Sequence, residues 1–385
     1  MKFFSLVWGN LWRRKLRTIL TIASTIAAFL LFGVLGAVRT GFSAGVEVSG
    51  ADRLMVTHKV SIIMQLPISY QDRIIAVPGV EAVTHASWFG GIYQEPKNFF
   101  PQMAVDPETY LDLYPEIRLK PEQKKAWLAD RTGAIVGRTT AERFGWKLGA
   151  RIPIQPTIYR RKDGSKTWDF NIDGIYDGAE QGTDTTGFFF RYDYLKEAAA
   201  VDRGSVGWYI IRIADPKRAP DISKTIDGMF ANSPEETKTA TEKAMAQGFA
   251  NQVGNIGAMM TAIVSAVLFT LLLVVGNTMA LAVRERTGEL AVLKTLGFKQ
   301  HQVLGLVLIE SCAVALLGGG LGLLGAFAVI PPLGKALRQF VPVFYLPGRD
   351  VAVAVGLMLL LGLAAGLPPA ITAMRLRIVD ALRRI

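Results

Sequence analysis

The stretch that decides the fold is residues 256–283, IGAMMTAIVSAVLFTLLLVVGNTMALAV, which contains no Asp, Glu, Lys or Arg. Three further stretches resemble it: residues 18–38 and 351–374 carry no charge, and residues 303–334 carry one, Glu310. A helix needs roughly 20 apolar residues to cross a bilayer, and soluble folds do not need runs of that length. The sequence therefore predicts four transmembrane helices.

The composition and the distribution of charge support this class of protein. Half of the 385 residues are apolar and 19% are charged, with a mean hydropathy of +0.29. The net charge is +11, and the N-terminal stretch, residues 284–302 and the C-terminal tail together hold thirteen basic residues against three acids. Residues 39–253 hold 27 of each sign. Because basic residues gather on the cytoplasmic side of membrane proteins, this distribution predicts cytoplasmic termini and leaves no basic face for nucleic acid.

The predicted topology is 1 + 3. The first apolar run is longer than the roughly 7 to 15 residues of a signal peptide, so we expect an uncleaved anchor. Phe4, Trp8 and Trp12 favour an interfacial helix before it. The predicted segments are a cytoplasmic amphipathic segment (1–17), transmembrane helix 1 (18–40), an extracytoplasmic α+β domain (41–250), transmembrane helix 2 (254–283), a cytoplasmic coupling segment (284–302), transmembrane helix 3 (303–334), a short outer loop (335–350), transmembrane helix 4 (351–374) and a cytoplasmic tail (375–385).

The extracytoplasmic segment shows alternating helical and strand patterns separated by turn residues, which predicts a mixed α and β domain. It has no disulfide, because the one cysteine, Cys312, lies in the third apolar run. We expect helices at 69–76, 139–144, 222–230 and 235–249, strands at 80–86 and 133–136, a hairpin of 152–159 and 167–175 around residues 162–165, a mobile loop at 176–186, and a last strand at 206–213.

Motifs that carry catalysis elsewhere lack the required context in this chain. Residues 41–45, GFSAG, match the G-x-S-x-G pattern of serine hydrolases but follow an apolar helix instead of a strand. Three histidines and one cysteine offer no metal-ligand spacing, and no P-loop motif occurs. We therefore predict no catalytic residue, no metal site and no cofactor in this chain, and if energy is used, a partner must supply it.

Two features of the apolar runs predict helix packing. Gly320, Gly322 and Gly325 form a G-x-G-x-x-G pattern without a preceding strand, which indicates a helix-packing face instead of a nucleotide site. Gly318 with Gly322, and 362 with 366, have the small-x-x-x-small spacing that lets helices approach closely. For Glu310, a structural role, either pairing with an arginine or capping another helix, is favoured over direct transport of an ion.

The most informative loop is residues 284–303, RERTGELAVLKTLGFKQHQV. Leu290, Leu293 and Leu296 recur on one face of a predicted helix that ends at Gly297. Such an amphipathic helix can lie on lipid or dock in a groove of a soluble partner, and its mixed charge favours the partner.

The pattern R-E-R-x-x-E-L-x-V-L-K-x-L-G-F resembles the coupling segment of the FtsX/MacB-like ABC transporter permeases. The basic approach to the first helix, the 1 + 3 topology and the final Asp380-Ala-Leu-Arg383 are also similar to this family. Thr287 and Gly288 depart from it, because basic or polar helix formers are more usual at these positions.

The resemblance implies a permease subunit that works as a homodimer, or as a heterodimer with a related permease, in the lipid of a bacterial plasma (inner) membrane. It would act on a separate cytoplasmic ABC ATPase, which would bind ATP and Mg²⁺. ATP-driven closure would move the coupling helices and, through the membrane helices, the outer domains. The resemblance assigns ATPase docking to five residues: Glu285, Glu289, Leu293, Lys294 and Gly297.

Two outputs remain open. One is export or efflux of a hydrophobic compound, peptide or lipid, with a periplasmic adaptor protein. The other is mechanotransmission to an extracellular partner such as a cell-wall hydrolase, without transport. The length of the outer domain favours export by analogy with export-type members. A self-contained secondary transporter has little support, because one ionisable group in four helices offers no midplane coupling site.

Overall fold

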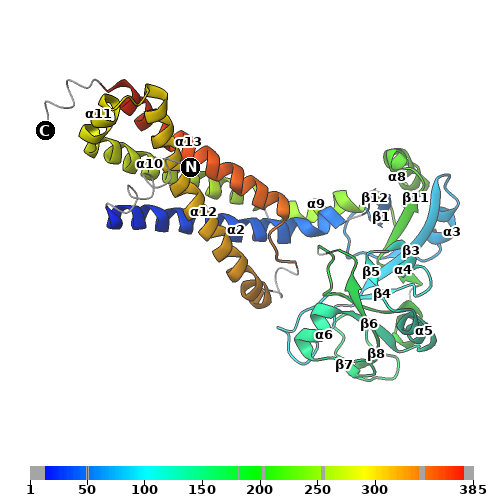
Figure 1. Cartoon of the computed structure of the whole chain (residues 1–385). Helices are drawn as coiled ribbons and strands as arrows, with labels where there is room; N and C mark the ends of the chain where they lie inside the picture. Colours follow the sequence, from blue (N-terminus) through cyan, green and yellow to red (C-terminus); the bar gives the residue numbers. More distant parts are fainter. Residues whose placement is uncertain are drawn as a thin grey trace. The chain divides into compact units, whose positions relative to one another are not determined.

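The computed structural model describes residues 14–48, 50, 52–180, 182–201, 204–252, 256–337 and 343–376. The chain divides into two compact units (Figure 1). The helical unit comprises residues 1–41, 255–336 and 344–385, and the α/β domain comprises residues 42–254 and 337–343. Phe4, Trp8, Trp12 and the tail residues 377–385 lie outside the described residues.

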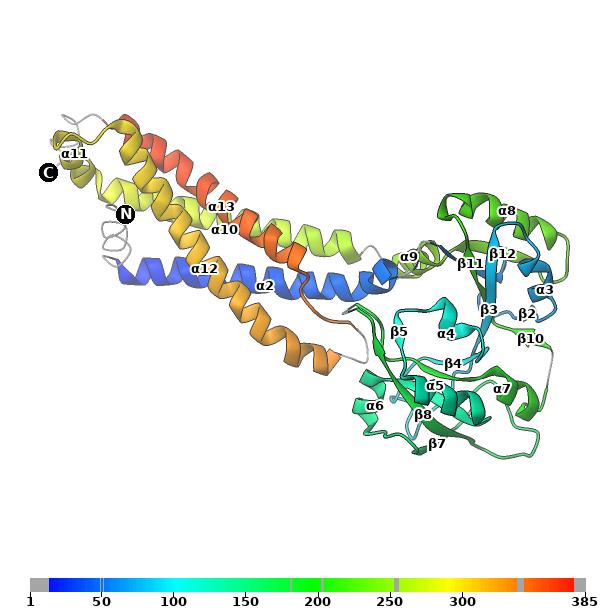
Figure 2. The same ribbon diagram turned by 45° about the vertical axis from the view of Figure 1, so that its right-hand side comes forward.

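The helical unit contains four helices that are long and apolar enough to cross a membrane, which confirms the predicted number. They continue past the apolar runs into the flanking polar residues. A fifth, short helix, α11 (Thr287–Thr295), lies between α10 and α12 (Figure 2). The long helices are α2 (Lys15–Val48), α10 (Ile256–Glu285), α12 (Gln300–Leu337) and α13 (Gly348–Arg375). Residues 41–45 continue α2, so the GFSAG motif has no strand-to-helix turn.

Glycines allow α12 to approach its neighbours closely, as their spacing predicts. A Cβ atom on Gly322 would lie 2.6 Å from the carbonyl oxygen of Ile26 in α2, and one on Gly362 would lie 2.7 Å from the Cα atom of Cys312. Gly320 does not share this face, because nothing lies within 4 Å of the position of its Cβ. The packing face on α12 is therefore made by Gly318, Gly322 and Gly325, and not by the whole G-x-G-x-x-G pattern.

We expect Gly322→Ala to destabilise the helical unit by about 1–3 kcal/mol, because the added methyl group meets the backbone of α2. Gly320→Ala, two residues away on the same helix, is the matched control and should be neutral or slightly stabilising. Thermal unfolding of the solubilised chain, with thiol labelling of Cys312 as the probe, measures the stability of both variants. Equal midpoints for the two variants would contradict this account of the packing.

The α/β domain is built on a ten-stranded mixed sheet, counted over the described residues. The strand order is β12-β1-β11-β3-β4-β9-β6-β8-β5, with β7 paired to β8. The β4–β9 and β6–β8 pairs are parallel, and the others are antiparallel. The strands are β1 (Arg53–His58), β3 (Val80–Trp88), β4 (Gln102–Val105), β5 (Ile117–Arg118), β6 (Gly133–Gly137), β7 (Arg151–Ile154), β8 (Trp168–Gly178), β9 (Phe188–Arg191), β11 (Trp208–Ile213) and β12 (Thr237–Thr241), and β2 (Leu66–Pro67) pairs separately with β10 (Ser205–Val206).

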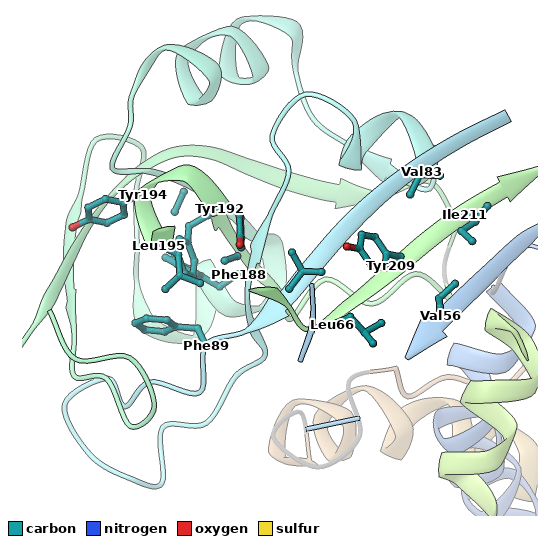
Figure 3. Close-up of a cluster of buried hydrophobic side chains, with 14 of the residues drawn as sticks. Val56, Leu66, Val83, Phe89, Phe188, Tyr192, Tyr194, Leu195, Tyr209 and Ile211 are labelled. Atoms are coloured by element: carbon teal, nitrogen blue, oxygen red, sulfur yellow. The ribbon is translucent and has the colours of Figure 1, made fainter. Parts of the chain in front are cut away.

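Helices cover both faces of this sheet, so alternate residues of a strand enter different cores. In β9, Phe188 and Phe190 enter one core, shown in part in Figure 3, and Phe189 enters the other. The first core is covered by α3, α6, α7 and α8, and the second by α4 and α5. These helices are α3 (Tyr70–Ile75), α4 (Tyr110–Leu113), α5 (Pro121–Ala129), α6 (Arg138–Phe144), α7 (Tyr192–Ala198) and α8 (Ala219–Met229), with α9 (Glu242–Gln252) following β12.

Most of the elements expected in this domain are present, with two corrections. The strand at 206–213 is not the last one, because residues 237–241, expected to be helical, form β12 beside β1. Their β-branched threonines fit a strand better than a helix. The predicted hairpin exists as the antiparallel pair β7–β8, but the loop that joins its strands runs from 155 to 167 and is much longer than the turn at 162–165.

His85 is a buried ionisable group in β3. It is 5% exposed, neither ring nitrogen has a hydrogen-bond partner among the described residues, and its ring lies edge-on to Tyr192 at 4.6 Å. Burial lowers the pKa of His85 to about 4, against a smaller opposing effect of Asp106. The native domain therefore holds this imidazole neutral.

We expect the α/β domain to lose stability as the pH falls from 6.5 towards 4, because the unfolded chain takes up the His85 proton before the folded one. A difference of this size in pKa corresponds to about 3 kcal/mol. His85→Phe removes this contribution. Urea unfolding, monitored by tryptophan fluorescence at pH 7 and pH 4.5, measures the free energy of unfolding of both chains. The variant should become more stable relative to the native chain at the lower pH. A difference that is the same at both pH values would refute the assignment.

Candidate functional site

The short helix α11 is positioned by the sequence on either side of it. Arg286 precedes it, and Gly297, with φ +96°, follows it in the left-handed conformation that favours glycine. The amide of Phe298 donates to the carbonyl oxygen of Leu293 at 3.1 Å and closes the turn. Leu290 is buried and Leu293 is half-buried, so this side of α11 packs on the membrane helices. Gly288 does not interrupt the helix.

Glu285, the last residue of α10, binds the start of α2. Its two carboxylate oxygens lie 3.0 Å from Arg14 and 2.8 Å from Arg17. The pair is partly exposed, so its contribution to stability is small. The contact nevertheless shows that Glu285, a predicted docking residue, binds arginines of its own chain.

Arg286, the next residue, binds α12. Its Nη2 lies 2.6 Å from an oxygen of Glu310, and both side chains are largely buried. Arg286 also donates to the carbonyl oxygen of Ala282 at 3.4 Å. Glu310 therefore has the structural partner that the sequence favoured for it, and Arg286 is a site residue that we did not single out.

Lys294, in the last turn of α11, binds the end of α13. Its Nζ donates to the carbonyl oxygens of Met374 at 2.9 Å and Leu376 at 2.8 Å. Both carbonyls lie at a helix C-terminus, where orphan acceptors favour a cation.

Glu285, Arg286 and Lys294 thus connect the α11 region to three different helices, α2, α12 and α13, while α10 leads directly into it. We call this set of polar contacts the collar. It makes α11 a part of the helical unit that cannot move far without moving the membrane helices or breaking charge-assisted bonds.

The other side of α11 faces away from the helical unit. Glu289, Val292 and Leu296 are exposed, Val292 by 45% and Leu296 by 72%. Leu296 does not share the packing face with Leu290 and Leu293, because α11 ends at Thr295 and Gly297 turns the chain. Sequence periodicity missed this change, since it assumed one helix up to the glycine.

A second ion pair, between a partly exposed arginine and a buried aspartate, ties α2 to α13. Arg39 donates to both carboxylate oxygens of Asp350 at 2.7 and 2.9 Å, and Asp350 is 3% exposed. We did not predict this pair. A signal was present, because Arg39 directly follows the first apolar run and Asp350 directly precedes the fourth.

No group of three or more His, Cys, Asp or Glu side chains in the described part of the chain is arranged to hold a metal ion. Four membrane-length helices among the described residues, with a separate α/β domain and a short, partly exposed helix between two of the spans, define a polytopic membrane protein.

Comparison with known proteins extends this description. Residues 261–378 match the family described as FtsX-like permease C-terminal. An uncharacterised ABC transporter permease of Methanocaldococcus jannaschii is 22% identical over 256 residues, which cover 64% of this chain and 61% of that protein's length. The chain is therefore a homologue of ABC transporter permeases and carries an FtsX-like permease domain.

Two solved structures are similar to the chain in part. The periplasmic region of MacB from Actinobacillus actinomycetemcomitans matches with a TM-score of 0.38 and 12% identity, over 54% of this chain and 96% of that one. The extracellular domain of the ABC-type transporter YknZ from Gram-positive bacteria matches with a TM-score of 0.37 and 10% identity, over 49% and 99%.

Proposed function

We propose that this chain is the membrane subunit of an ABC transporter, which transmits the ATP-driven motion of a separate cytoplasmic ATPase through its membrane helices to the α/β domain on the other side. The observation that carries the proposal is the collar. Glu285 and Arg286, just before α11, and Lys294 within it are bonded to α2, α12 and α13, and the α11 region presents Glu289, Val292 and Leu296 outward. The basic ends of the chain support a cytoplasmic position for α11.

The docking segment then divides into two sets of residues. Glu289, Val292 and Leu296 contact the ATPase, whereas Glu285, Lys294 and half-buried Leu293 hold α11 to the helices that must move. Gly297 shapes the turn between them. An ATPase can drive motion through this segment only if its docked geometry differs between nucleotide states.

A photoreactive amino acid at Val292 tests this proposal in the native cell. After irradiation we expect an adduct with a protein that carries a P-loop, identified by mass spectrometry. The same photoreactive residue at Leu360, which is 64% exposed in the middle of α13, is the control and should not give this adduct. The absence of any P-loop protein at Val292 would contradict the docking role.

The charge reversal Glu289→Lys tests the coupling itself in the reconstituted complex of permease and ATPase. It should abolish the stimulation of ATP hydrolysis by the permease, while Glu122→Lys in α5 should leave it intact. Unchanged stimulation in Glu289→Lys would count against this assignment.

For the output, we propose export of a hydrophobic compound, peptide or lipid by a dimer of this chain, with a periplasmic adaptor, in a bacterial inner membrane. The alternative is a regulator that transports nothing and switches an extracellular partner such as a cell-wall hydrolase. Crosslinking from an exposed position of the α/β domain distinguishes them, because an adaptor supports export and a hydrolase or its activator supports regulation.

A further inference from the structure

The α/β domain contains a pocket of about 1080 Å³ whose lining is mainly apolar. Its walls come from the segment before β2, from the loop after β7 and from α7 with the residues that follow it. We propose that this pocket binds an amphipathic anion: a molecule with one long apolar chain and an anionic headgroup, as in a fatty acid or an anionic lipid.

Exposed apolar side chains gather at this pocket. Among the residues between 50 and 252 whose side chains the structure describes, nine large apolar side chains are exposed, and five of them line it. Ile63 is 86% exposed and Val201 is 64% exposed, and both lie at its rim. Leaving apolar area in water costs about 25 cal/mol per Å², and contiguous exposed patches of this kind mark binding sites. The five are Ile63, Met64, Trp88, Ile158 and Val201.

The walls of the pocket are bonded to one another, so its shape exists before a ligand arrives. Ser205 Oγ donates to Gln65 Oε1 at 2.6 Å, and Gln65 Nε2 donates to the hydroxyl of Tyr159 at 2.6 Å. The amide of Ala200 donates to the carbonyl oxygen of Arg160 at 2.7 Å and joins the loop after β7 to the end of α7. A preformed site loses less entropy when it binds.

The floor of the pocket belongs to the rigid core of the domain. Tyr192 and Leu195 of α7 line the pocket and pack in the core that Figure 3 shows, beside Phe89 and Phe188. The hydroxyl of Tyr192 donates to the carbonyl oxygen of Ser205 at 2.8 Å. A ligand chain therefore meets a fixed apolar surface below and an exposed apolar rim above.

The charged groups of the lining favour an anion. Arg160 and Lys196 are exposed at the wall, and neither has an ion-pair partner among the described residues. The single acid of the lining, Glu235, lies 3.5 Å from His58. Several arginines of this domain, such as Arg191 with Asp193, are paired with carboxylates, whereas Arg160 and Lys196 leave their positive charges available to a ligand at the pocket.

The ligand's body must be apolar, because Gln65, Tyr159 and Ser205 already bond to one another and leave little hydrogen-bonding capacity for it. The volume is near the upper end of the range for small-molecule sites, roughly 300–1,000 Å³, and accommodates a long chain. Binding itself does not depend on ATP-driven coupling. Only the further step, that such an amphiphile is the exported compound, rests on the proposed function.

The test uses the full chain reconstituted without an ATPase in nanodiscs of phosphatidylcholine. A palmitic acid analogue with a diazirine in its chain is added and activated by light, and labelled peptides are mapped by mass spectrometry. We expect labelling at residues 62–64, 158–160 and 199–201 of the pocket. Labelling of the membrane helices by the same probe is the internal reference for its concentration in the disc. Absence of pocket labelling in the native chain, both by this probe and by the phospholipid probe described below, would overturn the proposal.

Three variants separate the parts of the site. Ile63→Asp combined with Ile158→Asp should lower pocket labelling about tenfold or more relative to the membrane helices, whereas Leu148→Asp, at an exposed leucine outside the pocket, should not. Arg160→Gln combined with Lys196→Gln should lower labelling by the acid to that of the corresponding photoreactive alcohol. Equal labelling by acid and alcohol in the native chain would overturn the anionic headgroup.

A second arm distinguishes the two sources of this chemistry. A photoreactive phosphatidylglycerol built into the disc replaces the free acid. Preferential labelling of the pocket by the free acid assigns the site to a fatty acid, and preferential labelling by the phospholipid assigns it to an anionic lipid. Failure of both probes would overturn the proposal while leaving the coupling role of α11 untouched.

Discussion

Replacing Arg53 by methionine is expected to destabilise the α/β domain by about 3–5 kcal/mol, because it leaves two carboxylates facing each other without their cation. Arg53 is 4% exposed and lies 2.5 Å from Glu116 and 2.6 Å from Glu242. It also donates to the carbonyl oxygen of Leu113 at 3.2 Å and stacks over the ring of Tyr114 at 4.5 Å. Burial alone would lower the pKa of Arg53, but the two carboxylates raise it above its usual value and keep it charged.

Urea unfolding of the full chain at pH 7 measures this effect as the difference in the free energy of unfolding between Arg53→Met and the native chain. The matched control is Arg131→Met, whose exposed pair with Glu197 should be worth less than about 1 kcal/mol. A deficit for Arg53→Met no larger than that of the control would show that these contacts do not hold the domain.

This arginine also occupies a special place in the chain. It lies five residues after the end of α2, and Glu242 is the first residue of α9, which precedes α10. The ion pair thus joins β1, the first strand after α2, to α9, the helix that precedes α10. Under the proposed function, this is where motion of α2 and α10 would reach the sheet.

The second large effect is expected for Glu310→Ala, which should lower the stability of the helical unit by about 3–5 kcal/mol by leaving Arg286 buried and unpaired. The measurement is thermal unfolding of the solubilised chain by circular dichroism. Lys299 is exposed and directly precedes α12, so Lys299→Ala is the control. Its melting temperature should be close to that of the native chain.

A double replacement distinguishes the net contribution of the ion pair to stability from the cost of leaving one charge unpaired. Arg286→Met combined with Glu310→Leu should recover most of the stability, because an apolar pair avoids the desolvation of an unpaired charge. The same double variant should nevertheless transmit ATPase motion poorly if the directional bond of the collar matters. A melting temperature of Glu310→Ala equal to that of the native chain would exclude a structural role for the carboxylate.

Some parts of the α/β domain could be predicted from local pattern and others could not. Residues 133–136 and 139–144 were recognisable as a strand and a helix, because each has its own period and turn residues. The Phe188–Arg191 strand was missed, since a strand buried on both faces lacks alternation, although its three consecutive phenylalanines were a usable signal. The strand Thr237–Thr241 was assigned to a helix, because its pairing with β1 is a contact between residues about 180 positions apart.

The candidate site shows the same division. Periodicity and the glycine located α11, and the isolated acid in the third apolar run marked Glu310 as a residue that needs a partner. Local sequence pattern could not predict that Arg286, and not Arg284, pairs with Glu310. It also could not predict that Lys294 binds the end of α13. Nor did it indicate that Leu296 is exposed while Leu290 and Leu293 pack on the membrane helices. Those outcomes depend on how the helices pack, and on the glycine contacts that set how closely they approach.

The sequence by itself determined the four membrane helices, their number and order, and the absence of a P-loop, because the cost of unpaired backbone groups in lipid and the spacing of a motif act within short stretches. Only the tertiary structure decided which charges meet: Arg286 with Glu310, Arg39 with Asp350, and Arg53 with Glu116 and Glu242. The physical reason is that a charge requires a partner, but its position along the chain does not specify which one. That choice is made when distant elements pack together.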